Sequence, residues 1–269
     1  MVKRERKRID THGFLIKRHL LTPEECEEVI LCLEGLKPKL FIPHSEIPWG
    51  YGNLLSEDKL KRVRENDYIK ALCEEIFGPA HTINHIVVNN KAPWIGPSGE
   101  WHQEIFNVDT YAPGANQCDE SWKDFLQIYI ALDKQTVENG CLRILPGSHK
   151  YGVLPHQDMV NQNYSHKRKI SSVLMTKLYK ECGIKNVELS PGDALFFNHR
   201  LVHGSPSNAS PLERRSIVMQ VRKKFIRDTE IFDRETKYRK NFVLKTLQTK
   251  IDSLKGKNIY ADFRPTEKE

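Results

Sequence analysis

A series of short strand-like runs, separated by turns, occupies the middle of the chain and limits its fold more than any other feature. The runs have the length and apolar content of β-strands, and they lie at 82–89, 125–132, 141–145, 194–197 and 214–221. Proline and glycine mark the turns between them, as in Pro146-Gly147 and Ser190-Pro191-Gly192. Because many short strands broken by such turns are typical of a double-sheet jelly roll, the sequence predicts a mainly β protein with that core.

Helical patterns precede the strands. Thr22, Pro23 and Glu25 form a helix start, because threonine caps, proline suits the first helical position and glutamate completes a capping box. Apolar residues follow at helical spacing, and a second helix is expected over about 57–77. A short strand is expected within 10–20. The segment 37–56 is rich in proline and glycine and is predicted to be irregular.

The two ends of the chain are strongly charged. Residues 1–9 are predicted to form a solvated basic tail, because no apolar run follows as it would in a secretory signal. Residues 226–269 are predicted to form a C-terminal helical extension, since apolar side chains recur there at helical spacing. A helix in this region fits packing on the barrel or on the partner subunit of a homodimer. We expect a single domain over 1–269.

Composition and charge narrow the class of protein. With 269 residues, of which 39% are hydrophobic, the chain can bury a substantial core, and no apolar run approaches the length of a membrane span. Its six cysteines lack CxxC spacing and are typical of a reduced, cytoplasmic protein. The net charge of +7 favours anionic partners, which include small anionic substrates and nucleic acid, although the same charge also serves solubility alone.

Three residues have the types and spacing of a metal site. His102 and Glu104 are two apart in a strand-like segment, so their side chains point to the same face. His203 opens a Gly-Ser turn much later in the chain, after an apolar run. Two histidines and one carboxylate can hold Fe(II) on one face and leave three coordination positions free. His-x-Glu pairs are common by chance, so this interpretation depends on neighbouring features.

A later strand carries arginine where a carboxylate could be bound. In the run 213–221, Arg214, Ser216 and Gln220 share one face, and mostly apolar side chains share the other. An inward arginine holds a carboxylate through two parallel hydrogen bonds. The alternative, that Arg214 and Arg215 are both surface charges, stays open from the residues alone.

The motifs, taken in order, resemble those of the phytanoyl-CoA dioxygenase family of Fe(II)- and 2-oxoglutarate-dependent oxygenases. The resemblance covers roughly residues 10–225, and the block from Asn139-Gly140-Cys141-Leu142 to Gly147-Ser148-His149-Lys150 is its most specific part. The other motifs that carry it are Asn90-Lys91-Ala92-Pro93, His102-Gln103-Glu104, Pro191-Gly192-Asp193-Ala194-Leu195-Phe196-Phe197, and His203-Gly204-Ser205 followed by Arg214. It implies a cupin-like, double-stranded β-helix core with a metal at one open end.

The resemblance also implies roles for individual residues. His102, Glu104 and His203 match the iron ligands of the family. Arg214 matches the arginine that holds the distal carboxylate of 2-oxoglutarate, with Ser205 beside it.

Further pocket residues follow from position. Tyr129 stands where the family often has an aromatic residue lining the co-substrate pocket. Gln127 and Asn84, on strands expected to line the barrel, are candidates for hydrogen bonds to 2-oxoglutarate or to the substrate.

Other polar residues are expected to be structural or solvated. His149 is predicted to hold loop backbone, and His199 to lie behind the site or at the surface. Lys91 and Arg143 could meet an anionic substrate, but exposed lysine and arginine are usually just solvated.

One residue departs from the family pattern. The usual aspartate ligand is Glu104 here, which is one methylene longer and an equally good oxygen ligand, so a metal site is still expected. Because the carboxylate is kept, halogenation is disfavoured.

The expected activity is hydroxylation of a C–H bond by Fe(II), 2-oxoglutarate and O2, with release of succinate and CO2. We expect a small metabolite, for which the net charge would allow an anionic one, as in natural-product biosynthesis, and neither a membrane nor a nucleic acid as partner. Desaturation or ring closure would use the same ligands. The rivals are a non-catalytic, cupin-like metal-binding interaction protein and an oxygenase of a macromolecular substrate.

Overall fold

The computed structural model describes residues 2–36, 40–41, 48–51, 54–55, 57–104, 125–159 and 168–223. The chain divides into two units, Met1–Lys224 and Phe225–Glu269. The predicted C-terminal helical extension, and the homodimer contact through it, lie outside the described residues.

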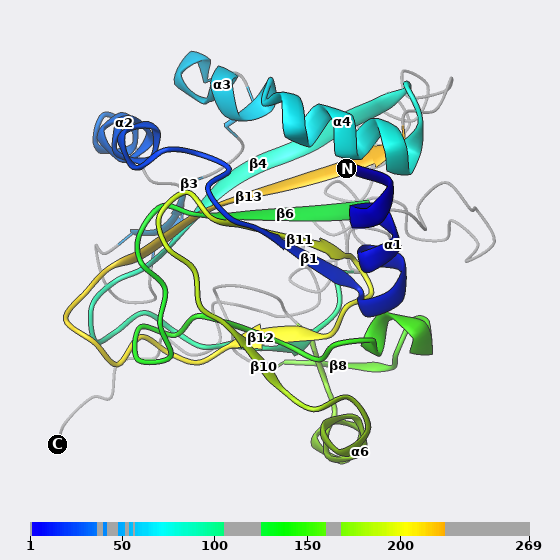
Figure 1. Cartoon of the computed structure of the whole chain (residues 1–269). Coiled ribbons are helices and arrows are strands. Elements are labelled where there is room, and N and C mark those ends of the chain that lie inside the picture. Colours follow the sequence, from blue (N-terminus) through cyan, green and yellow to red (C-terminus); the bar gives the residue numbers. More distant parts are fainter. Residues whose placement is uncertain are drawn as a thin grey trace, which may run out of the picture. The chain divides into compact units, whose positions relative to one another are not determined.

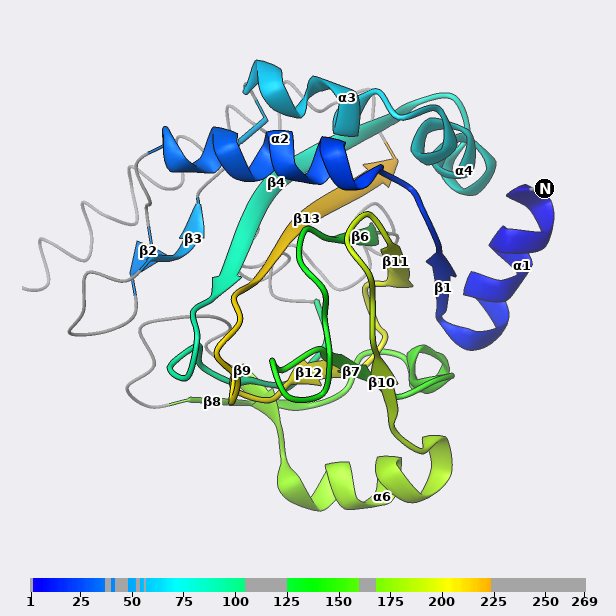
Figure 2. The ribbon, with the colours of Figure 1, turned by 60° about the vertical axis from the view of Figure 1, so that its left-hand side comes forward.

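Two antiparallel sheets form the body of the first unit (Figures 1 and 2). The larger sheet contains β1 (Phe14–Lys17), β2 (Leu40–Phe41), β3 (Pro48–Tyr51), β4 (His81–Lys91), β6 (Phe125–Ala131), β11 (Ala194–Asn198) and β13 (Arg214–Lys223). Its strand order is β1-β11-β6-β13-β4-β3-β2, in which strands distant in sequence are neighbours. The long pair of β13 with β4 brings residues more than a hundred positions apart into register.

The smaller sheet contains β5 (Gly99–His102), β7 (Leu142–Ile144), β10 (Lys185–Val187) and β12 (His203–Ser205). Its order is β10-β7-β12-β5, and β8 (His156–Asp158) and β9 (Arg168–Ile170) form a separate hairpin. The smaller sheet lies on one side of the larger one, as Figure 2 shows. This arrangement confirms the predicted mainly β, jelly-roll fold.

Helices cover the other side of the larger sheet. They are α2 (Pro23–Glu34), the short turns η1 (Asp58–Leu60) and α3 (Lys61–Arg64), and α4 (Asp67–Phe77), which Figure 2 shows beyond β4 and β13. The predicted capping box of α2 is present: the Thr22 Oγ1 accepts from the Glu25 amide at 3.2 Å, and the Glu25 carboxylate accepts from the Thr22 amide at 2.8 Å. Elsewhere η3 (Ser148–Tyr151) follows β7, and α6 (Ser172–Cys182) lies beyond the smaller sheet.

Two sequence predictions about helices need correction. The helix expected over 57–77 is interrupted, because the Asn66 side chain accepts from the Tyr68 and Ile69 amides, at 3.1 and 3.2 Å, and so starts a new helix. The segment 37–56, predicted to be irregular, contains β2 and β3. Proline is tolerated at the first residue of a strand, which is where Pro48 stands in β3.

The N-terminus also differs from its prediction. Residues Val2–His12 form the helix α1, with Ile9 buried, instead of a solvated tail. Arg6 ties α1 to α4 through a hydrogen bond from Nη1 to the Glu75 carbonyl at 2.6 Å. The strand expected within 10–20 is confined to β1, because Gly13, with φ +86°, turns the chain sharply after α1.

The strands of the larger sheet divide their side chains between two faces. One face packs apolar side chains against the helices, and these include Ile86, Val88, Leu126, Ile128, Ile130, Phe196, Ile217 and Met219. The opposite face, which we call the inner face, looks toward the smaller sheet and carries Tyr129, Leu195 and Phe197, which pack with Leu142 and Ile144. Polar residues are buried on this inner face as well, and they form the pocket described below. None of the described helices has the length and apolar character needed to cross a membrane.

Candidate active site

Three potential metal ligands meet at the end of the smaller sheet. His102 ends β5 and His203 begins β12, and the two are direct partners in the antiparallel ladder. Glu104 follows His102 by two residues, and its Oε1 lies 3.5 Å from His102 Nε2 and 3.4 Å from His203 Nε2. The donor atoms of all three lie within 4.8 Å of one another. The predicted cluster of two imidazoles and one carboxylate is therefore assembled by the fold.

Backbone carbonyls orient both imidazoles. The Nδ1 of His102 lies 2.5 Å from the Glu100 carbonyl, and the Nδ1 of His203 lies 2.9 Å from the Leu201 carbonyl. A carbonyl accepts only, so each Nδ1 carries the proton and each Nε2 keeps its lone pair for an ion. The donor set and its tautomers fit a non-haem Fe(II) site.

A pocket extends from these ligands along the inner face. Arg214 and Tyr129 lie along its wall, and the Tyr129 hydroxyl accepts from Arg214 Nη1 at 2.8 Å and donates to Gln135 Oε1 at 2.9 Å. Ser205 lines the same pocket and accepts from Lys91 Nζ at 2.8 Å. The structure thus brings Arg214, Ser205 and Tyr129 into one pocket with the metal ligands, as the sequence predicted.

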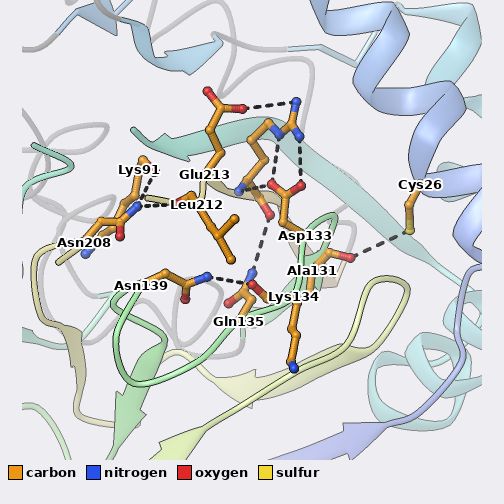
Figure 3. Close-up of polar contacts among 11 residues, drawn as sticks. Cys26, Lys91, Ala131, Asp133, Lys134, Gln135, Asn139, Asn208, Leu212 and Glu213 are labelled. Atoms are coloured by element: carbon orange, nitrogen blue, oxygen red, sulfur yellow. Dashed lines mark hydrogen bonds and ion pairs between the residues drawn. The ribbon is translucent and has the colours of Figure 1, made fainter. Parts of the chain in front are cut away.

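Lys91 is a pocket residue that sequence reasoning treated as solvated. It is only 7% exposed, it pairs with Arg214 across β4 and β13, and its Nζ also contacts the Pro206 carbonyl. Burial, with smaller contributions from the nearby Arg214 and Arg143, lowers the pKa of Lys91 to about 6. Asn208 links the end of β4 to the segment before β13, because its Nδ2 donates to the Lys91 carbonyl at 3.0 Å and to the Leu212 carbonyl at 2.6 Å (Figure 3).

The cationic end of the pocket is suited to a carboxylate. Arg214 is 3% exposed, and among the described residues neither it nor Lys91 has an ion-pair partner. The Arg214 Nε also lacks a hydrogen-bond acceptor within the described part of the chain. A buried guanidinium without a counter-ion is costly, and a carboxylate bound beside it would also favour the ammonium form of Lys91. This end of the pocket therefore fits the distal carboxylate of a dicarboxylic acid whose other end reaches the metal ligands.

Arg215, the alternative to Arg214 as the residue that binds a carboxylate, forms an ion pair with Asp133 instead. Its guanidinium forms two hydrogen bonds with Asp133, at 2.9 and 2.8 Å, and its amide donates to the same carboxylate at 2.7 Å. Figure 3 shows Asp133 with these contacts beside Glu213, which lies 3.4 Å from Arg215 Nη1. Arg214 is thus the member of the pair that lines the pocket.

The remaining predicted residues lie in varied places. Gln127 and Asn84 are not among the residues that line the pocket, although both belong to strands of the larger sheet. His149 holds loop backbone as expected, with its Nε2 3.0 Å from the Asp10 carbonyl. His199 is buried behind the site, where its carbonyl accepts from the Glu104 amide at 2.8 Å.

Gln103, which lies between His102 and Glu104, is a residue whose role the sequence did not indicate. It is fully buried, and its Nε2 donates to the Gly152 carbonyl at 2.9 Å and the Arg200 carbonyl at 2.7 Å. Its Oε1 accepts from the Leu154 amide at 2.9 Å. One side chain therefore joins the β5 end, the loop after η3 and the turn that leads into His203.

Replacing Gln103 with leucine should loosen the metal site without removing a ligand. Three backbone groups would lose their partner, each costing about 1–3 kcal/mol, so the melting temperature should fall. Affinity for Co(II) or Zn(II), measured by calorimetry on the folded variant, should fall about 10- to 100-fold, as for other residues that support ligands. The exposed Gln157→Leu variant serves as the control; equal metal affinity in both variants would contradict this role.

The chain belongs to the phytanoyl-CoA dioxygenase (PhyH) family, whose model matches residues 9–216. Among curated relatives, the dioxygenase sphC of Aspergillus fumigatus is 23% identical over 81% of this chain and 58% of its own length. The ectoine dioxygenase of Streptomyces coelicolor is 28% identical over 78% of this chain and 73% of its own length. The chain thus spans little more than half of the Aspergillus relative.

Solved structures share the fold. EctD from S. alaskensis, determined with 2-oxoglutarate and 5-hydroxyectoine, superposes with a TM-score of 0.65 at 17% identity and covers 82% of this chain and 75% of its own. EvdO2 from Micromonospora carbonacea, determined with 2-oxoglutarate, gives a TM-score of 0.61 at 23% identity, covering 82% of this chain and 90% of its own. These likenesses agree with the jelly roll seen here.

Proposed function

We propose that this protein is an Fe(II)- and 2-oxoglutarate-dependent oxygenase that acts on a small metabolite. One observation carries the proposal: the cluster of His102, Glu104 and His203 opens into a pocket that is also lined by the buried guanidinium of Arg214 and the buried amine of Lys91. Membership of the PhyH family supports it, as does the likeness of the fold to EctD and EvdO2, whose structures were both determined with 2-oxoglutarate.

Each part of the pocket has a distinct task in this proposal. When bound, Fe(II) with 2-oxoglutarate and O2 supplies the oxidising chemistry that hydroxylates a C–H bond and yields succinate and CO2. His102 and His203 present their Nε2 lone pairs, and Glu104 adds the negative charge that favours a divalent ion. Arg214, steadied by Tyr129, holds the distal carboxylate of 2-oxoglutarate, and Ser205 and Lys91 complete that end.

Apolar side chains keep water from the reacting centre. Phe197, Leu142 and Val218 line the same pocket as Arg214 and the two histidines. The Phe197 ring packs edge-on to His203, with ring centroids 4.8 Å apart. Because an apolar lining excludes water, the electrostatic contacts inside the site are stronger.

The proposal is tested by spectroscopy and product analysis. Anaerobic addition of Fe(II) and 2-oxoglutarate to the folded protein should give a weak visible charge-transfer band, and O2 should then release succinate. The His203→Ala variant should give neither signal. A folded protein with metal bound but no band and no succinate would favour the rival, a metal-binding interaction protein without turnover.

The state of the cysteines bears on the cellular compartment. The described cysteines are all free thiols, which supports a reducing, cytoplasmic environment.

A macromolecular substrate, such as a nucleic acid, is the second candidate, because the net charge is +7. It requires nucleic-acid binding that weakens steeply with salt, whereas we expect no such binding.

Binding of 2-oxoglutarate should take up a proton at Lys91. In the free protein the Lys91 pKa of about 6 leaves the amine mostly neutral at pH 8. A bound dianion favours the ammonium form and raises this pKa, so affinity should fall as pH rises above about 6, by at most about tenfold per pH unit. Calorimetry in buffers of different ionisation enthalpy measures the uptake. A Lys91→Met variant should show none, and buffer-independent heats in the unmutated protein would contradict the prediction.

A further inference from the structure

A row of four side chains crosses the inner face of the larger sheet. Strand register pairs Phe197 of β11 with Gln127 of β6, Gln127 with Gln220 of β13, and Gln220 with His85 of β4. All four lie on the inner face, because their strand neighbours at odd spacing pack against the helices. We call Phe197, Gln127, Gln220 and His85 the amide row.

The amide row lies beside the metal ligands and away from the cationic end. Phe197 contacts the His203 ring, and the charge of Glu104 influences the pKa of His85. Along β13, Gln220 is six residues from Arg214, a separation of about 20 Å in an extended strand. A co-substrate bound between Arg214 and the metal ligands therefore does not extend to Gln220, and Phe197 is the member of the row that lines the pocket.

The polar members of the row are the buried Gln127 and Gln220 and the half-buried His85, and none of them carries a charge. Gln127 is 2% exposed, and its Oε1 has no hydrogen-bond partner among the described residues. Burial lowers the pKa of His85, so its imidazole is neutral near pH 7. The Gln220 Oε1 accepts from Asn84 Nδ2 at 3.1 Å, and Asn84 Oδ1 accepts from Arg222 Nε at 3.0 Å, which fixes the orientation of these amides.

These contacts indicate the chemistry of a ligand. A buried carbonyl oxygen without a partner, as at Gln127, calls for an N–H or O–H donor. A carboxylate or phosphate would face that oxygen and the nearby Glu104, and the row itself offers no lysine or arginine to balance it. Phe197 provides an apolar surface at the end of the row that adjoins His203.

We propose that the amide row binds the primary substrate, and that this substrate is a neutral molecule with an amide N–H or a hydroxyl group that donates to Gln127 Oε1. The apolar part of the substrate packs on Phe197, which places its C–H bonds beside the metal ligands. This inference rests on the proposed oxygenase function and assigns the substrate class for that site.

Ligand-observed NMR on the diamagnetic Zn(II) form, saturated with 2-oxoglutarate, tests the assignment. The probes are matched neutral and anionic pairs: benzamide with benzoate, isobutyramide with isobutyrate, and cyclohexanol with cyclohexanecarboxylate. Saturation with 2-oxoglutarate keeps the carboxylates from binding at Arg214. We expect the neutral member of a pair to bind about tenfold or more tightly than its partner, because unpaired polar groups discriminate strongly.

Two variants link that preference to the row. Gln127→Leu should remove the preference for neutral probes, and Gln127→Met provides a second test if the leucine variant does not fold. Gln157→Leu, at an exposed glutamine, should behave as the unmutated protein does. Affinity for 2-oxoglutarate, measured on the same samples, should be unchanged in all of them.

The outcomes distinguish a failure of the proposed oxygenase function from a failure of the amide-row assignment. Loss of metal or 2-oxoglutarate binding in the unmutated protein would overturn the proposed function. With that binding intact, the amide-row assignment is wrong if carboxylates bind as well as their neutral partners or if no neutral probe binds at millimolar concentration. It is also wrong if both Gln127 variants keep the preference, in which case these amides only hold the strands together.

Discussion

Replacing Glu104 with glutamine should lower the affinity for a divalent metal by more than about 100-fold, because loss of a supporting residue alone costs 10- to 100-fold. The amide removes the negative charge that faces His102 and His203 at 3.5 and 3.4 Å, while it keeps nearly the same shape. Calorimetry with Co(II) under anaerobic conditions measures the change, and succinate formation should be lost with it.

The Glu104→Asp variant is the matched control. It keeps the charge and shortens the side chain by one methylene, to the aspartate of the family pattern. We expect it to retain metal binding, because aspartate offers the same oxygen donors. Unchanged affinity in the glutamine variant would remove Glu104 from the ligand set.

Replacing Arg214 with leucine should weaken binding of 2-oxoglutarate by about 100-fold or more, since truncating one partner of a buried charge pair costs 2–5 kcal/mol. Metal affinity should be unchanged, because His102 and His203 lie on the other sheet and Glu104 follows its strand β5. The anaerobic charge-transfer band, titrated with 2-oxoglutarate, gives the affinity.

Arg215→Ala supplies the comparison. Its guanidinium is bound to Asp133 and does not line the pocket. We expect full 2-oxoglutarate affinity and a small loss of stability, about 1 kcal/mol or less for a partly exposed pair. A larger loss of affinity in this variant than in Arg214→Leu would reverse the assignment.

Local pattern was enough to predict the longer strands β4, β6, β11 and β13 and the residues that share a face of them, whereas β2 and β3 were missed. The spacing of His102 and Glu104, and the alternation around Arg214, depend only on the two-residue period of a strand. Fold and family followed from the same motifs. The alternation alone left Arg214 and Arg215 as alternatives, and the ion pair with Asp133, distant in sequence, is what separates them.

What could not be predicted depends on tertiary contacts. Lys91 looks like an ordinary solvated lysine until β4 pairs with β13 and places it beside Arg214. Gln103 points away from the metal ligands, as a strand requires, but the loops that it joins are 49 and 97 residues away. The helix α1 is mostly charged, and its contact with α4 distinguishes it from a tail.

His102 and His203 are paired in the β-ladder of the smaller sheet, and this pairing allows the protein to fold before it binds its metal ion. Main-chain hydrogen bonds between β5 and β12 hold the two histidines side by side without an ion. A zinc finger, in contrast, is unfolded without its metal. Chains produced without iron should therefore be fully structured. They should accept the ion afterwards, and chelation should strip it reversibly.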